Sequence, residues 1–90
     1  MSVSKEIPII NKLGLHLRAA AQFVQTANRH QCDVWVAKDE RRVNGKSILE
    51  LMTLSAGQGT VLEIVGRGED AAALVEALAR LIESGFDERD

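Results

Sequence analysis

His16 and Arg18 are the first residues whose types and spacing suggest chemistry. His16 follows Gly14 and Leu15 and stands where an Ala-rich, helix-forming stretch begins, with Arg18 two residues later. A helix start favours anions, because it presents free N–H groups and the positive end of the helix dipole. An imidazole nitrogen placed there could take up a phosphoryl group, which the N–H groups and the Arg18 guanidinium would then hold. A surface histidine that only caps the helix is the alternative interpretation.

Ser47 is the second candidate, because it precedes an apolar segment at residues 48–54 that reads as a short helix. Its position predicts an N-cap, worth about 1 kcal/mol, and Glu50 three residues later predicts a capping box. The same serine could be phosphorylated, since a helix N-terminus tolerates phosphate, which would add about two negative charges to the surface. The spacing alone favours the cap.

The apolar residues after Ser47 are too many for a short helix to bury them all. Ile48, Leu49, Leu51 and Met52 fall on adjacent faces of the predicted helix. Most of them belong to the core by default, but an exposed remainder would suggest a docking surface.

Other sites for chemistry are weaker. His30, Cys32 and the distant His16 lack the ligand spacing of a zinc site, and no metal or cofactor is expected. The sequence contains no defensible pair of catalytic carboxylates or Ser–His–Asp pattern, and no second catalytic group accompanies His16. We therefore do not expect an independent enzyme.

Length and composition set the class of protein. Ninety residues, 46% hydrophobic and 27% charged, fit one folded domain spanning 1–90. A net charge of -2 argues against a general nucleic-acid binder, and 3% aromatic residues exclude a typical base-stacking sheet. The single cysteine cannot form a disulfide within the chain, so the sequence gives no reason to expect an oxidising compartment. Without a signal peptide or an apolar run of ~20 residues, we expect a cytoplasmic protein with no membrane insertion.

Seven elements would have to position these residues. The hydrophobic pattern predicts strands at residues 6–10, 33–38, 41–43 and 60–65, helices at residues 17–28, 48–54 and 71–84, and a polar tail at residues 86–90. Pro8 lacks an N–H, which favours the edge or the end of the sheet. The apolar face predicted for the first helix comprises Leu17, Ala20, Ala21, Phe23, Val24 and Ala27. This order predicts an α+β fold, with helices on one face of an antiparallel or mixed sheet.

Two long segments together resemble HPr, the histidine phosphocarrier family of the bacterial phosphotransferase system. They read GLHLRAAAQFVQTA and NGKSILELMTLSAGQGTVLEIVGRGEDAAALVEAL, and the resemblance extends from about Val3 to Glu83. The family pattern is GLHxRPAA, followed by a KS serine before a short helix. The resemblance implies an open-faced β-sandwich: a four-stranded antiparallel sheet covered on one face by three helices, in the order β-α-β-β-α-β-α. It also favours the phosphoryl-acceptor interpretation of His16.

The same resemblance implies a function and its partners. His16 would accept a phosphoryl group on Nδ1 from enzyme I, itself charged from phosphoenolpyruvate, and pass it to an enzyme IIA domain. Arg18 would help to hold the phosphoryl group, and Ser47 would be the regulatory serine phosphorylated by an HPr kinase/phosphorylase. The implied docking residues are Leu17, Ala21, Ile48, Leu49 and Met52. The chain would then be a monomeric carrier.

One departure from the family pattern lies beside the proposed acceptor. Ala19 stands where the family has proline. Alanine still forms the helix and leaves one more N–H donor near the site, so we expect a modest change in transfer rate. Leu17 is also bulkier than usual, and Gln25 and Asn28 lack a positive charge that some members carry.

Two other functions fit the same residues. An HPr-like protein could regulate partners through Ser47 and carry no sugar-transport flux. An unrelated small α+β module could use His16 and Arg18 only to bind an anion. Covalent phosphorylation at His16 would separate this last class from the carrier.

Overall fold

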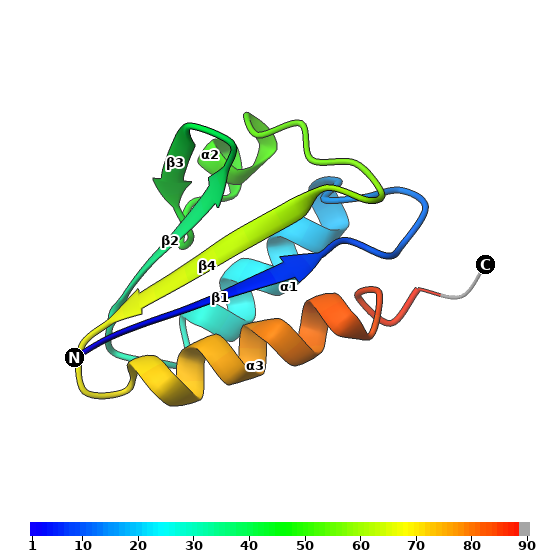
Figure 1. Cartoon of the computed structure of the whole chain (residues 1–90). Coiled ribbons are helices and arrows are strands. Elements are labelled where there is room, and N and C mark those ends of the chain that lie inside the picture. The colour runs from blue at the N-terminus through cyan, green and yellow to red at the C-terminus, as the bar shows by residue number, and fades with distance from the viewer. Residues whose placement is uncertain (89–90) are drawn as a thin grey trace.

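A four-stranded antiparallel sheet forms the frame of the structure, a computed structural model that describes residues 1–88 (Figure 1). The elements in chain order are β1 (Ser2–Pro8), α1 (Leu17–Ala27), β2 (Asp33–Lys38), β3 (Arg41–Asn44), α2 (Ile48–Met52), β4 (Val61–Arg67) and α3 (Ala71–Glu83). The predicted order and the four-stranded antiparallel sheet are confirmed. The strands lie side by side as β1-β4-β2-β3, an order that hydrophobic patterning alone does not give.

The helices cover one face of the sheet and leave the other face open (Figure 1). Alternate strand residues point toward α1 and α3 and are almost fully buried, as the two-residue period of a strand requires. The side chains that fill this layer are Ile7, Val34, Val36, Leu62 and Ile64 from the strands and Phe23, Leu74, Leu78 and Ile82 from the helices. None of the helices within residues 1–88 is both long and apolar enough to cross a membrane.

Strand β1 begins earlier than its hydrophobic pattern indicates. It pairs with β4 from Ser2, opposite Arg67, to Pro8, opposite Val61, so the prediction of residues 6–10 is wrong. The prediction missed the first part of β1 because its residues are mostly polar and show no alternation of apolar side chains, although their backbone pairs with β4. Pro8 ends the edge strand, as its missing N–H predicts. The remaining element boundaries agree with the predictions to within two residues.

The buried face of α1 is narrower than predicted. It consists of Ala19, Ala20, Phe23, Val24 and Ala27. Leu17 is 63% exposed, and Ala21 is only half-buried. At 100° per residue, a stripe centred on Ala20, Phe23 and Ala27 places Leu17 and Ala21 at or beyond its margin. Leu17 is therefore a surface residue.

The segment predicted as a polar tail, residues 86–90, begins with a buried aromatic side chain. Gly85 ends α3 with a φ of 68°, and the Phe86 side chain is 1% exposed. The Phe86 N–H donates to the carbonyl of Leu81 over 3.0 Å. The segment after α3 is thus anchored to the core. Residues 89–90 of the predicted tail lie outside the described residues.

Candidate functional site

His16 is the residue from which α1 begins. Its backbone is extended (φ -77°, ψ 178°), and its carbonyl accepts the first bond of the helix, from the Ala20 N–H over 2.8 Å. The His16 side chain forms no hydrogen bond with the helix start, so it is not a side-chain cap. With 26% of that side chain exposed, the imidazole stands beside free first-turn N–H groups and is open to chemistry.

A tight turn and a loop from elsewhere in the chain fix the approach to His16. The Gly14 N–H donates to the Asn11 carbonyl over 3.2 Å, and Gly14 has a φ of 66°, which favours glycine. A Cβ on Gly14 would lie 2.5 Å from the carbonyl oxygen of Ala56. The next residue, Leu15, donates its N–H to that same oxygen over 2.8 Å. The loop after α2 therefore sets the position of the residues that precede His16.

Glu88 faces His16 from the segment that follows α3. One carboxylate oxygen of Glu88, Oε2, contacts Nε2 of His16. The other, Oε1, accepts a hydrogen bond from Nδ2 of Asn11 over 2.8 Å. Figure 1 shows the segment after α3 at the same end of the molecule as the loop between β1 and α1. Two segments far apart in the sequence thus meet at His16.

Asn11 supports the contact between Glu88 and His16 from the interior of the protein. Its side chain is 4% exposed, and it is the one buried polar residue within the described part of the chain. Besides Glu88, Nδ2 of Asn11 donates to the Gly14 carbonyl over 2.9 Å. The Asn11 hydrogen bond first, then the His16 hydrogen bond, and finally the charges of His16 and Arg18, lower the pKa of the Glu88 carboxyl. Glu88 is therefore held as an anion.

Arg18 lies on the exposed first turn of α1, two residues from His16. Its charge makes the smallest of the contributions that lower the pKa of the Glu88 carboxyl. A guanidinium beside free helix N–H groups is suited to a phosphoryl dianion.

Ser47 is the N-cap of α2, as predicted. Its Oγ accepts a hydrogen bond from the Glu50 N–H over 3.2 Å. The predicted capping box is wrong, because the Glu50 carboxylate accepts from the Asn44 N–H over 3.0 Å and not from Ser47. The Ser47 N–H donates instead to the Asn44 carbonyl over 3.2 Å. Glu50 therefore ties the helix to the end of β3.

The residues implied as docking positions divide by exposure. Leu17, Leu49 and Met52 are 63%, 82% and 37% exposed. Ala21 and Ile48 are half-buried, and Ile48 packs against the core. These residues belong to α1 and α2, which contact one another. Leu51, by contrast, is fully buried.

His30 and Cys32 lie in the connection between α1 and β2, which is not where His16 stands. Nδ1 of His30 contacts the carboxylate of Asp70, and the His30 carbonyl accepts from Nζ of Lys46 over 2.8 Å. Cys32 is half-buried against the core, and burial raises the pKa of its thiol. Within residues 1–88, no group of three or more His, Cys, Asp or Glu side chains could hold a metal ion.

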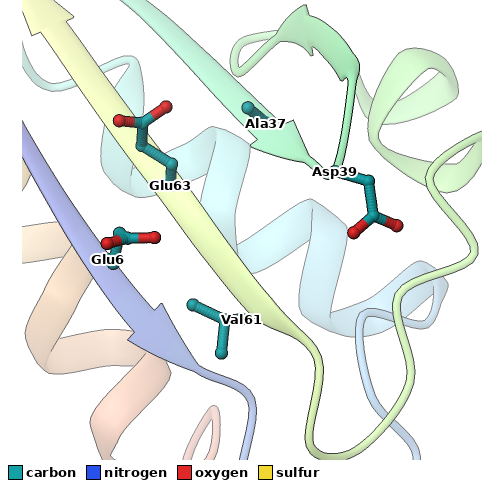
Figure 2. Close-up of a pocket in the computed structure, with 5 residues that line it drawn as sticks. All are labelled: Glu6, Ala37, Asp39, Val61 and Glu63. Carbon is teal, nitrogen blue, oxygen red and sulfur yellow. The ribbon is translucent and has the colours of Figure 1, made fainter.

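The open face of the sheet carries a pocket of a different kind. Figure 2 shows the side chains that line it: Glu6, Ala37, Asp39, Val61 and Glu63. Glu6 and Glu63 are directly opposite one another in the β1–β4 register, which places like charges side by side. None of the residues that the sequence suggested for chemistry lines this pocket.

Asn11 and Glu88 are the site residues that sequence reasoning missed. Neither belongs to a recognisable motif, and Glu88 is 72 residues from His16. The signal that could have found it is Phe86, an aromatic residue within an otherwise charged tail. An aromatic side chain in that position predicts that the tail packs back on the core.

Comparisons with known proteins agree with this architecture. A family model for the phosphorylation site of the HPr component of the phosphotransferase system matches residues 3–84. Phosphocarrier protein HPr of Neisseria meningitidis is 50% identical over 86 residues, which cover 96% of this chain and 97% of that protein. Its counterpart in Pseudomonas aeruginosa is 51% identical over 84 residues, covering 92% and 93%. A crystal structure of HPr-C-His from Thermoanaerobacter tengcongensis gives a TM-score of 0.94 at 44% identity, covering 98% and 99%. The likeness extends over sequence and fold together.

Proposed function

The chain belongs to the HPr family of phosphocarrier proteins of the phosphotransferase system, carriers and not independent catalysts, and we propose that His16 is the residue that carries the phosphoryl group. The observation that carries the proposal is the position of His16. His16 is the residue directly before the first turn of α1, its side chain makes no capping hydrogen bond, and its ring is partly exposed.

The transfer needs only a nucleophile and groups that hold the arriving charge. A ring nitrogen of His16 attacks the phosphorus atom, and a nitrogen–phosphorus bond forms as the bond to the donor breaks. The new dianion meets the first-turn N–H groups of α1, from Leu17 to Ala19, and the Arg18 guanidinium. A partly exposed site suits a carrier, because a second protein must reach the same group to remove it.

The exposed apolar side chains supply a docking surface next to this residue. Leu17, Leu49 and Met52 would contact enzyme I and then an enzyme IIA domain. Ser47 lies at the start of the helix that carries Leu49 and Met52. Phosphorylation of Ser47 by an HPr kinase/phosphorylase would add negative charge beside the apolar residues and weaken docking.

Labelled phosphoenolpyruvate and enzyme I from the same organism test the proposal. We expect wild type and His30→Ala to take up acid-labile label to the same extent, and folded His16→Ala to take up none. His30 is the matched control, because it is the second of the two histidines in the chain and lies outside the site. Equal labelling of His16→Ala would contradict the proposal, and so would an unlabelled, folded wild type.

A further inference from the structure

We propose that Glu88 is a positioning residue for phosphoryl transfer, whose carboxylate holds the Nε2–H of His16 and so presents Nδ1 to the phosphoryl donor. This inference rests on the proposed function of His16 and adds a residue to the transfer machinery. It concerns the tail of the chain, outside the segments whose motifs resemble a known family.

The carboxylate is fixed from both of its oxygens. Oε2 contacts Nε2 of His16, and Oε1 accepts from Nδ2 of Asn11 over 2.8 Å. Asn11 is itself fixed, because it is buried and its amide also donates to the Gly14 carbonyl. Gly14 precedes His16 by two residues. The hydrogen bonds therefore run from His16 through Glu88 and Asn11 back to the backbone beside His16.

The segment that carries Glu88 is also anchored. Phe86 is buried in the core, and its N–H donates to the Leu81 carbonyl over 3.0 Å. The Glu88 N–H donates to the Gly85 carbonyl over 3.1 Å. The side chain of Glu88 is 16% exposed, which is less than the 26% of His16. Glu88 is therefore presented by a folded turn.

The contact selects the nitrogen that reacts. A neutral imidazole carries one N–H, and an ionised carboxylate can only accept a hydrogen bond. The proton must then lie on Nε2, which leaves the lone pair on Nδ1. Within residues 1–88, α1 donates no N–H to the His16 side chain, so its helix does not compete for that lone pair.

The same contact stabilises the charge that the transfer creates. The Nδ1 lone pair forms the new nitrogen–phosphorus bond, and the electron pair of the breaking bond stays on the donor atom of phosphorylated enzyme I. The proton stays on Nε2 throughout, and the ring becomes cationic. The Glu88 carboxylate then faces an N–H that carries more positive charge than before, so the hydrogen bond strengthens during the reaction. When the phosphoryl group leaves, its bonding pair returns to Nδ1.

The test compares Glu88→Ala with Asp87→Asn. Asp87 is exposed and adjacent, so its variant removes one tail charge and leaves the His16 contact in place. In single-turnover transfer from phosphorylated enzyme I, we expect Glu88→Ala to lower the rate constant at saturation by about three- to tenfold with little change in half-saturating concentration. Asp87→Asn should match wild type in both quantities.

A spectroscopic readout separates positioning from a general structural effect. The nitrogen chemical shifts of the His16 ring should report the Nε2–H tautomer in wild type and Asp87→Asn, and a mixture of tautomers in Glu88→Ala. The inference is overturned if folded Glu88→Ala transfers at the wild-type rate or faster and keeps the same ring shifts. A change confined to the half-saturating concentration would also overturn it, since that would assign Glu88 to docking. In each case wild type still takes label on His16, whereas failure of the proposed function would leave wild type unlabelled.

Discussion

The Leu15 N–H and the Ala56 carbonyl oxygen, 2.8 Å apart, join the segment that leads into α1 to the loop that follows α2. This hydrogen bond links the two helices that carry His16 and Ser47 at their starts. It requires the backbone at Gly14 to pass very close to residues 56–57. The position of His16 therefore depends on a loop that is remote in sequence.

Gly14→Ala should lower the free energy of unfolding by about 2–4 kcal/mol, because the new methyl group would meet Ala56 O at 2.5 Å in a left-handed backbone conformation. Chemical denaturation measures the change. Gly57→Ala is the matched control, since a Cβ there has no neighbour within 4 Å, and we expect it to stay within about 0.5 kcal/mol of wild type. Similar losses in the two variants would contradict the close approach at Gly14.

Leu49→Ala should weaken docking to enzyme I without affecting the fold. Leu49 is 82% exposed, so its side chain contributes little to the core but is available to a partner. We expect the half-saturating concentration for phosphoryl transfer to rise by about three- to tenfold, as for the loss of an apolar contact worth about 1 kcal/mol. Val61→Ala removes a 50% exposed side chain from the open face of the sheet and should leave transfer unchanged. An equal rise of the half-saturating concentration in both variants would contradict the assignment of Leu49 to docking.

Ser47→Asp should reduce transfer from enzyme I while keeping α2 intact. Aspartate is as good an N-cap as serine and can accept from the Glu50 N–H, so helix content should not change. The added charge beside the apolar docking residues should raise the half-saturating concentration by about two- to fivefold, less than phosphate would. Ser2→Asp, on an exposed residue at the start of β1, controls for the added charge. Transfer rates equal to wild type at every concentration would count against regulation through Ser47.

Ala19→Pro should alter the transfer rate modestly. Ala20 donates the first hydrogen bond of α1, so the Ala19 N–H is one of the donors left without a carbonyl at the helix start. Proline would remove that donor without breaking the helix, and we expect a change of about two- to fivefold with retained circular dichroism. If the variant transfers at the wild-type rate, the Ala19 N–H has no part in holding the phosphoryl group.

Acid should remove a stabilising contribution of Glu88. Its pKa in the folded protein lies below the ordinary value of 4.5, chiefly because Asn11 donates a hydrogen bond to it, with His16 and the Arg18 charge adding to the effect. A lowered folded-state pKa means that the contribution is complete above pH 4.5 and is lost as pH falls through the folded-state pKa. Wild type should therefore exceed Glu88→Gln in stability at about pH 6, and the difference should shrink as the pH falls below 4.5. A stability difference independent of pH would contradict the assignment, with Asp87→Asn as the charge control.

The sequence was sufficient for the parts of the site that lie close together in the chain. His16 at the start of an Ala-rich helix and Ser47 as an N-cap follow from local signals, since capping and helix propensity act over a few residues. The exposure of Leu17 required the exact phase of α1, because a shift of one residue turns a side chain by 100°.

The contacts that hold His16 from outside its own helix were beyond sequence reasoning. Glu88 and Asn11 come together at His16 only after α3 has packed against β1 and brought the segment that follows the helix to the end of that strand. Glu50 likewise has a local partner in the capping-box pattern, but it bonds to Asn44 because the β2–β3 hairpin delivers that N–H. The local sequence pattern offers Glu50 a partner, but the tertiary structure determines which N–H group the carboxylate binds.

The most direct measurement follows the phosphoryl group after it has arrived. Phosphorylated protein is separated from enzyme I and phosphoenolpyruvate and then mixed with an enzyme IIA domain from the same organism. A carrier loses its label to the acceptor much faster than to water, and the label appears on the enzyme IIA domain. Release of the label as inorganic phosphate, at the same rate with and without the acceptor, would contradict the role of His16 as a carrier.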